Sequence, residues 1–184
     1  MDIRIHKIRN GSRANGPGLR NVVWFQGCTL NCRGCFNPQT HHRNGGESVP
    51  IAHVFSKLME TACDGISISG GEPFQQPEAL LALLQMIREN STASILVFSG
   101  YPYDFLKRDP LFTACLDHID ALICGPYRDD LPPAYERFCS SSNQELILLT
   151  GRYTTEDFAN LPIGEYFIEP DGELFISGIC SKRI

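Results

Sequence analysis

Apolar residues recur at two different spacings along this chain, and the change between them predicts strands separated by helices. Short runs rich in β-branched and aromatic residues predict strands, whereas apolar residues three or four positions apart predict helices. The first residues, Met1 to His6, already alternate as a strand would. Further strands are expected at 19–26, 65–69, 94–99, 119–124 and 145–149, and helices at 49–61, 78–89, 111–117 and 154–160.

Local signals mark several ends of these segments. Ser48 is expected to cap the first helix, and Pro77 is expected to open the second. Near the C-terminus, 166–168 and 174–176 predict a hairpin around Asp171 and Gly172, a favoured pair in tight turns.

Strands that alternate with helices favour a parallel sheet built from βα units. We expect an α/β fold with about five to six mainly parallel strands, arranged as an open or partial (β/α) barrel. The 184 residues suit a single domain spanning 1–184. The longest expected loop is the polar stretch from Tyr127 to Asn143.

Charge and hydropathy narrow the function classes. The formal net charge is −5, which argues against electrostatic binding to nucleic acid or to an acidic membrane surface. Every apolar run is broken by charge, Gly or Pro before it could span a bilayer. The N-terminus has no apolar signal core, so we expect a cytoplasmic protein.

The number and spacing of the cysteines point to a metal site. Eight cysteines are many for a cytoplasmic chain, where clustered cysteines indicate metal or redox sites rather than disulfides. Cys28, Cys32 and Cys35 form a C-x3-C-x2-C loop directly after a predicted strand. Three thiolates on one tight loop can hold three corners of a [4Fe–4S] cluster, which leaves one iron free to bind a substrate.

Other interpretations of this loop remain open on spacing alone. His41 or His42 could complete a Cys3His zinc site, which would be a structural tetrahedral centre. A ferredoxin-type cluster is less well matched, because neither standard ferredoxin spacing is present. The other five cysteines are scattered and contain no C-x2-C pair: Cys63, Cys115, Cys124, Cys139 and Cys180. Buried thiols are therefore the default expectation for them. The polar loop around Cys139, however, suggests an exposed, reactive thiol.

A second motif, Gly70-Gly71-Glu72-Pro73, follows the strand predicted at 65–69. The carboxyl ends of parallel strands are where α/β proteins bind ligands. Paired glycines let the backbone approach a ligand closely, and Glu72 can accept hydrogen bonds from an ammonium group. An ordinary strand–helix turn with a solvated glutamate is the alternative.

Together, the two motifs resemble those of the radical S-adenosylmethionine (SAM) enzymes. The segment Asn15-Gly16-Pro17-Gly18-Leu19-Arg20 is similar to the entry segment of glycyl-radical-enzyme activases, most of all the activators of anaerobic ribonucleotide reductase. Shorter matches at 35–38, 99–101, 125–127 and 142–144 support this resemblance, which covers roughly residues 3–180.

The resemblance implies a site and its cofactors, a [4Fe–4S] cluster and S-adenosylmethionine. Cys28, Cys32 and Cys35 would ligate three irons, and SAM would chelate the fourth. Gly70, Gly71 and Glu72 would contact the methionine amino group of SAM, Phe36 would lie near its adenine, and Ser99 and Gly125 would make further contacts.

The implied activity is reductive cleavage of SAM to a 5′-deoxyadenosyl radical, which abstracts hydrogen from a glycine of a partner glycyl radical enzyme. A flavodoxin or ferredoxin is the implied electron donor. Two alternatives are a stand-alone radical SAM enzyme that modifies a peptide or small molecule, and a non-catalytic, zinc-stabilised binding module. Asn15 and Cys124 stand where the family often has aspartate, which puts the substrate in doubt.

Overall fold

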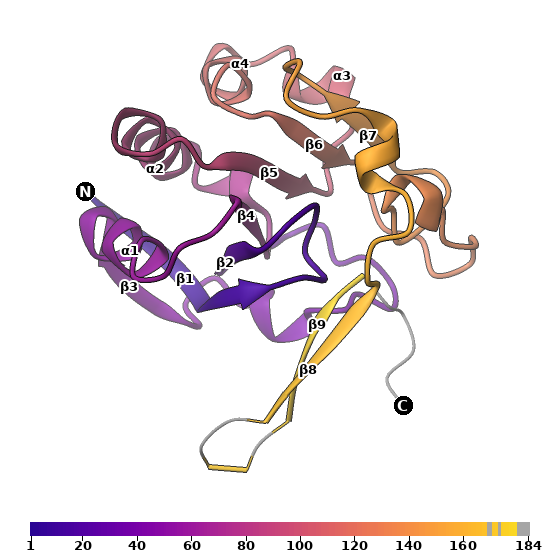
Figure 1. Cartoon of the computed structure of the whole chain (residues 1–184), viewed down its shortest axis with the longest axis horizontal. Coiled ribbons are helices and arrows are strands. Elements are labelled where there is room, and N and C mark those ends of the chain that lie inside the picture. The colour runs from indigo at the N-terminus through magenta and orange to yellow at the C-terminus, as the bar shows by residue number, and fades with distance from the viewer. Residues whose placement is uncertain (169–170, 173, 180–184) are drawn as a thin grey trace.

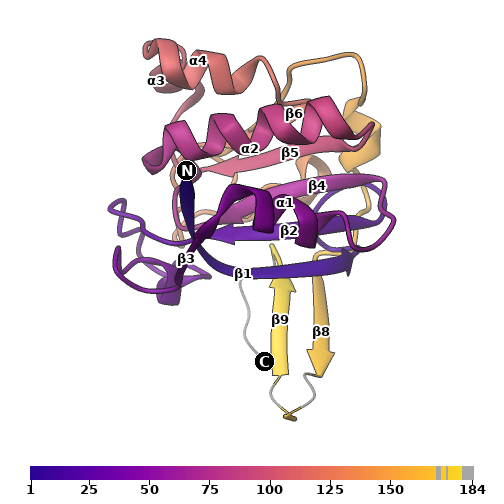
Figure 2. The same cartoon turned by 90° about the vertical axis from the view of Figure 1, so that its left-hand side faces the viewer.

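The computed structural model describes residues 1–168, 171–172 and 174–179. Its main sheet has the strand order β3-β1-β2-β4-β5-β6-β7, and α1, α2 and α4 lie along the outer face of this curved sheet (Figures 1 and 2). The strands are β1 (Asp2–Ser12), β2 (Arg20–Phe25), β3 (Glu47–Pro50), β4 (Gly65–Gly70), β5 (Ser94–Ser99), β6 (Ala121–Cys124), β7 (Glu145–Leu148), β8 (Gly164–Ile168) and β9 (Leu174–Gly178). The α-helices are α1 (Ile51–Leu58), α2 (Pro77–Asn90), α3 (Tyr103–Leu106) and α4 (Pro110–Leu116).

The central strands β2, β4, β5 and β6 are parallel, so the expected α/β fold is confirmed. The sheet is nevertheless larger and more mixed than expected, because β1, β3 and β7 add antiparallel pairings at its two sides. The connection from β6 to β7 contains only a one-turn 3-10 helix, Tyr135–Arg137. It packs at the carboxyl ends of the strands instead of crossing over the sheet, so β7 runs back antiparallel.

The core fills both faces of the central strands. All six residues of β2 are buried, as expected for a strand covered on both sides. On α2, the buried residues follow helical spacing and pack on the sheet: Ala79, Leu80, Leu83, Leu84 and Ile87. A second cluster, which includes Leu96, Ile123, Phe138 and Phe158, fills the inner face of β5 and β6.

Two helix predictions were wrong in detail. Ser48 does not cap α1, because Glu47–Pro50 forms β3 and pairs with β1. Pro50 directly precedes the helix, which begins at Ile51 and ends at Leu58 rather than Thr61. The helix expected at 154–160 is a single 3-10 turn, Thr155–Phe158, closed by a capping box between Thr154 and Asp157.

The predicted C-terminal hairpin is confirmed. Strands β8 and β9 pair antiparallel with Phe167 opposite Phe175, and they project away from the main sheet (Figures 1 and 2). Gly172 in the turn has a φ of +86°, which suits glycine. Cys180 lies outside the described residues. No helix in the described part of the chain is long and apolar enough to cross a membrane.

A buried arginine joins the amino ends of the central strands. The Arg20 side chain is fully buried, and its guanidinium donates to the hydroxyls of Ser67 (2.6 Å) and Tyr153 (2.9 Å) and to the Ile66 carbonyl (2.6 Å). Burial lowers the pKa of Arg20 from its usual value, because the charge is removed from water and surrounded by neutral oxygens. Together with a hydrogen bond to the hydroxyl of Ser94 at the start of β5 (3.1 Å), these bonds connect β2, β4, β5 and the 151–154 turn.

Candidate active site

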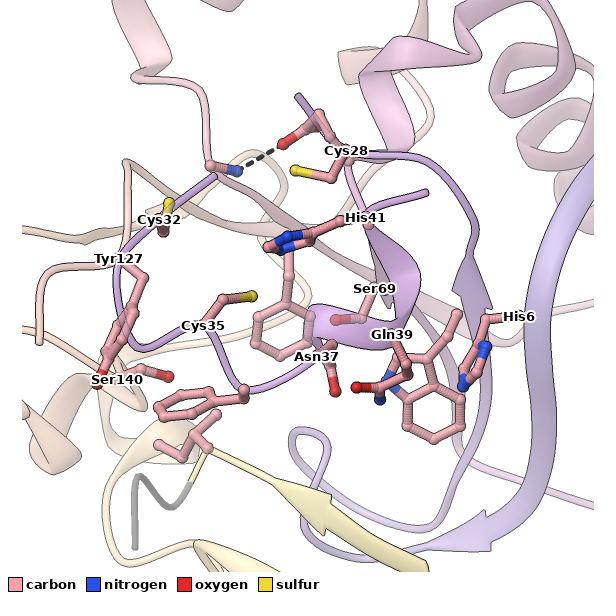
Figure 3. Close-up of a pocket in the computed structure, with 18 of the residues that line it drawn as sticks. His6, Cys28, Cys32, Cys35, Asn37, Gln39, His41, Ser69, Tyr127 and Ser140 are labelled. Atoms are coloured by element: carbon pink, nitrogen blue, oxygen red, sulfur yellow. Dashed lines mark hydrogen bonds between the residues drawn. The ribbon is translucent and has the colours of Figure 1, made fainter. Parts of the chain in front are cut away.

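The predicted site residues meet at the carboxyl ends of the parallel strands. The cysteine loop follows β2, the glycine–glutamate turn follows β4, and Ser99 and Gly125 lie at the ends of β5 and β6. A cavity of about 940 Å³ opens between these segments (Figure 3). It is lined by every candidate: Cys28, Cys32, Cys35, Phe36, Gly70, Gly71, Glu72, Ser99 and Gly125. The structure thus brings all the candidate residues to one cavity, as expected for parallel strands whose ends share one edge.

Backbone hydrogen bonds hold the cysteine loop, both within the loop and to the segment that follows it. Cys28 N–H donates to the His41 carbonyl (3.1 Å), and Cys35 N–H donates to the Cys32 carbonyl (3.2 Å). Gly34 has a φ of +69°, and a Cβ there would lie 2.9 Å from the Cβ of Asp129. Glycine at this position thus allows both the turn and the close approach of the segment after β6.

That segment packs against the outer side of the loop. Arg33 forms an ion pair with Asp129 (3.2 Å), and the Phe36 and Tyr127 rings lie 4.6 Å apart, centre to centre. Phe36 and Tyr127 both line the cavity, so an aromatic pair stands beside the third cysteine. Nothing in the spacing of the cysteines indicated this pairing.

The three thiols fit a cubane cluster. All three are half-buried and border the same cavity (Figure 3). Among the described residues, no group of three or more Cys, His, Asp or Glu side chains converges as ligands of a single metal ion. A cubane requires a different arrangement, because each thiolate binds a separate iron. Burial raises the pKa of the Cys28 and Cys35 thiols, and bound iron would supply the positive charge that favours their thiolates.

The glycine–glutamate turn lies directly against the cysteine loop. Gly71 N–H donates to the Phe25 carbonyl (2.8 Å), and Glu72 N–H donates to the Gly27 carbonyl (2.9 Å). Gly70 has a φ of +111°, and a Cβ on Gly71 would lie only 2.3 Å from the carbonyl oxygen of Gly27. Only glycine lets these two segments approach so closely, so the pair of glycines sets the position of the cysteine loop.

Glu72 is more deeply buried than a solvated turn residue. It has no exposed surface, and its carboxylate accepts hydrogen bonds from Phe74 N–H (3.0 Å), Ser99 Oγ (2.9 Å) and Gly100 N–H (2.7 Å). Burial raises the pKa of Glu72 to about 7, against the opposing effect of these hydrogen bonds. The alternative of an ordinary exposed turn is therefore wrong.

Ser99 and Gly125 take indirect positions. The Ser99 hydroxyl donates to Glu72 and accepts from Tyr101 N–H (3.1 Å). Gly125, with a φ of +106°, accepts from the Gln144 side chain through its carbonyl (3.1 Å). These bonds show Ser99 orienting the glutamate and Gly125 shaping the rim of the cavity.

Several cavity residues were not predicted as site residues. His6, Trp24, Asn37 and Gln39 line the cavity, and so does His41, which the sequence suggested only as a possible zinc ligand (Figure 3 labels all of these but Trp24). They come from segments that carry no recognisable motif apart from the Cys-Phe-Asn-Pro run, and only the fold brings them together.

None of the isolated cysteines Cys63, Cys115, Cys124 and Cys139 lines the cavity. Cys115, Cys124 and Cys139 are buried, and burial raises their pKa values to about 12, 12 and 11. The expectation of an exposed, reactive Cys139 was wrong, because its loop folds inward and packs the residue between β6 and the 3-10 turn Tyr135–Arg137. Thiols with such pKa values remain protonated and unreactive at neutral pH.

Comparison with known proteins agrees with this geometry. The family described as 4Fe-4S single cluster domain matches residues 14–147, a range that contains every candidate site residue. The chain belongs to this family. The match supports iron–sulfur binding instead of the alternative zinc centre.

Several relatives of this chain are named as activating proteins. The pyruvate formate-lyase-activating enzyme of Clostridium pasteurianum is 34% identical over 64% of this chain, and the chain spans about half (53%) of that enzyme. The anaerobic ribonucleoside-triphosphate reductase-activating protein of Escherichia coli K12 is 34% identical over 71% of this chain and 88% of its own length. The protein of that name from phage T4 is 28% identical over 72% and 85%.

These matches confirm the resemblance to radical SAM activating enzymes and the two cofactors it implies, a [4Fe–4S] cluster and S-adenosylmethionine. The roles of individual residues remain predictions, supported by their shared position around one cavity.

Proposed function

We propose that this chain activates a glycyl radical enzyme, with anaerobic ribonucleotide reductase as the first partner to test. The observation that carries the proposal is the single cavity shared by three half-buried thiols, the Gly70–Gly71 backbone and the Glu72 carboxylate. The names of the relatives favour a protein partner over a peptide or small-molecule substrate.

Each residue has a physical task in this proposal. Cys28, Cys32 and Cys35 would hold the [4Fe–4S] cluster. When bound and reduced, the cluster supplies the electron that splits the sulfonium of SAM into methionine and the 5′-deoxyadenosyl radical that takes hydrogen from a glycine.

The turn after β4 would position the methionine end of SAM. Oε2 of Glu72 accepts a hydrogen bond from Gly100 N–H and keeps a further lone pair for the ammonium group of SAM. Gly71 allows the close approach between this turn and the cysteine loop. The methionine end of SAM and the cluster would therefore be held in a fixed position relative to each other.

The aromatic pair Phe36 and Tyr127 would border the adenine. Its rings line the cavity beside Cys35 and offer an apolar wall that excludes water from a reactive radical. Hydrogen-bonding side chains on the facing wall, Asn37 and Gln39 among them, would contact the incoming substrate backbone.

A flavodoxin or ferredoxin is the proposed electron donor, because the chemistry consumes one low-potential electron per SAM cleaved. We also infer a cytoplasmic location. No disulfide joins the seven cysteines within the described residues, which suits a reducing compartment.

The test is anaerobic reconstitution with iron and sulfide, followed by dithionite and SAM. We expect 5′-deoxyadenosine from the wild type and none from Cys32→Ala. With the anaerobic ribonucleotide reductase of the same organism present, a glycyl radical signal should appear in the electron paramagnetic resonance (EPR) spectrum.

The possible outcomes separate the hypotheses. Formation of 5′-deoxyadenosine without a radical on any glycyl radical enzyme of that organism would contradict the activase role and favour a stand-alone radical SAM enzyme. Equal yields from wild type and Cys32→Ala would contradict the assignment of the cluster ligands.

A further inference from the structure

The β8–β9 hairpin has two faces of different character. Phe167 and Phe175 form a cross-strand pair on the face toward the body of the protein. On the opposite face, Tyr166 pairs with Ile176 and Ile168 pairs with Leu174. Because side chains alternate along a strand, these four apolar residues share one surface, which we call the hairpin face.

The hairpin face is exposed to an unusual degree. The exposed fractions are 52% for Tyr166, 80% for Ile168, 58% for Leu174 and 41% for Ile176. Apart from these, the large apolar residues exposed within the described part of the chain are Met1, Phe105 and Tyr135, which are scattered. Apolar residues gathered on one exposed surface indicate a binding surface.

The other face of the hairpin is firmly attached to the protein. The Phe175 ring packs edge-on against Trp24 at 5.4 Å, and the Lys7 ammonium lies over the same ring at 4.0 Å. Arg9 lies over the Phe167 ring, also at 4.0 Å. Cation–π contacts of this kind fix the orientation of a hairpin that would be marginal alone.

Polar contacts strengthen the base of the hairpin. Glu165 accepts from the Ser12 hydroxyl (2.7 Å) and from the backbone N–H of Arg13. Asn15 donates its side-chain amide to Ser177 (2.6 Å), a bond between the segment before β2 and β9. An exposed apolar surface on a fixed support is preorganised, which lowers the entropy lost on binding.

The hairpin face continues into the active-site cavity. Leu174 and Ile176 belong to that face and also line the cavity, as do the other residues of β9 and Ile179 directly after it (Figure 3 shows the cavity). A macromolecule that inserts a segment into the cavity beside β9 would therefore contact the hairpin face. A second copy of this chain seated there would obstruct the same opening.

The hairpin also lies outside the part of the chain shared with the family. The family match ends at residue 147, whereas the hairpin begins at Gly164. The residues proposed for cluster and SAM binding all lie within the matched range, so the hairpin can take a different role, the recognition of a partner.

We propose that the β8–β9 hairpin is the docking element for the protein substrate, and that its apolar face binds the partner surface next to the hydrogen-donating loop. This inference rests on the proposed function for the identity of the partner. A stable protein interface buries about 800 Å² on each side, so the rim of the cavity would contribute the remaining contacts.

The test uses the double variant Tyr166→Ser/Ile168→Ser, which alters two exposed residues of the hairpin face that do not line the cavity and leaves the attached face intact. Phe105→Ser is the matched control, because Phe105 is also exposed (45%) but lies on α3 and does not line the cavity. The binding probes are the anaerobic ribonucleotide reductase and the pyruvate formate-lyase of the same organism.

One of these two enzymes should be activated by the wild-type chain. For that enzyme, we expect the double variant to raise the dissociation constant at least about 10-fold and to lower the glycyl radical yield in parallel. Formation of 5′-deoxyadenosine without partner should match the wild type, and Phe105→Ser should bind normally. An unchanged dissociation constant would overturn the inference, as would a change from dimer to monomer with partner binding intact. If the wild type activates neither enzyme, the proposed function fails, and the docking inference fails with it.

Discussion

The two ends of the parallel strands are built for opposite purposes. At the amino ends, the Arg20 side chain is buried and donates hydrogen bonds to Ser67, Tyr153 and the Ile66 carbonyl. At the carboxyl ends, three thiols and a buried carboxylate surround a cavity. One end uses its polar groups to join strands, and the other keeps polar groups available for ligands.

Glycines show the same division. A Cβ on Gly65, at the amino ends, would lie 2.4 Å from the Arg20 guanidinium, so this glycine makes room for a structural side chain. A Cβ on Gly71, at the carboxyl ends, would collide with the backbone of the cysteine loop. Substitutions at the amino ends should therefore lower mainly the free energy of unfolding, and those at the carboxyl ends should lower mainly the rate of SAM cleavage.

The largest effect is expected at Arg20. Arg20→Met removes the guanidinium donors to the buried Ser67 hydroxyl and Ile66 carbonyl, and we expect the free energy of unfolding to fall by about 4 kcal/mol. Urea denaturation of the reduced apoprotein measures this loss, while SAM cleavage per folded molecule should be retained. An unchanged free energy would mean that relief of guanidinium desolvation cancels the lost hydrogen bonds, and the amino ends would not be the stabilising region.

Burial of Glu72 at the active site is expected to lower the stability of the folded protein at neutral pH. Its pKa in the folded protein is raised from 4.5 to about 7, so the folded state holds a proton that the unfolded state has released between these pH values. Stability is consequently full below pH 4.5 and falls by roughly 3 kcal/mol as the pH rises to about 7.

Glu72→Gln should remove this slope, because glutamine does not titrate. The comparison of the two proteins by urea denaturation from pH 4.5 to 7.5 measures the effect. Parallel stability curves for wild type and variant would show that Glu72 is already ionised across this range.

Gly71→Ala tests the contact between the two motifs. The added Cβ would force the Gly27 carbonyl and the cysteine loop away from the turn, and we expect the rate of 5′-deoxyadenosine formation to fall about 10-fold or more. Gly151→Ala is the control, because a Cβ there meets no atom within 4 Å. Equal rates for Gly71→Ala and wild type would show that the two segments need no fixed spacing.

The smallest effect is expected at Asn15, where the family often has aspartate. The Asn15 amide donates to Ser12 (2.7 Å) and Ser177 (2.6 Å), and Asn15→Asp removes both donors from a buried position. We expect a loss of about 1 kcal/mol in thermal unfolding, because the Ser177 hydroxyl can rotate to donate instead, whereas the Ser12 hydroxyl already donates to Glu165. A loss above about 3 kcal/mol would show that Asn15 supports the fold as strongly as Arg20 does.

Prediction from sequence worked where chemistry and local pattern coincide. The spacing of Cys28, Cys32 and Cys35 after a strand located the cavity, and the Gly70-Gly71-Glu72 turn located its second wall. Both follow from short-range rules about strand ends and glycine.

Features that depend on distant partners were missed. Ser48 looked like a helix cap, but pairing of its segment with β1 overrode this local preference. The polar sequence around Cys139 suggested exposure, and only the packing of Phe138 and Phe158 on the inner face of the sheet explains its burial. Likewise, no local signal indicates that Arg20 would be buried, because its acceptors are spread over three other segments.

The measurement that tests the central claim most directly is the EPR spectrum of the anaerobically reconstituted, dithionite-reduced protein, with and without SAM, together with iron and zinc analysis. We predict about four irons per chain, the signal of a reduced [4Fe–4S] cluster, and a change of that signal on adding SAM, because three cysteine ligands leave one iron open. Bound zinc with no cluster signal, or a cluster spectrum that SAM leaves unchanged, would contradict the account.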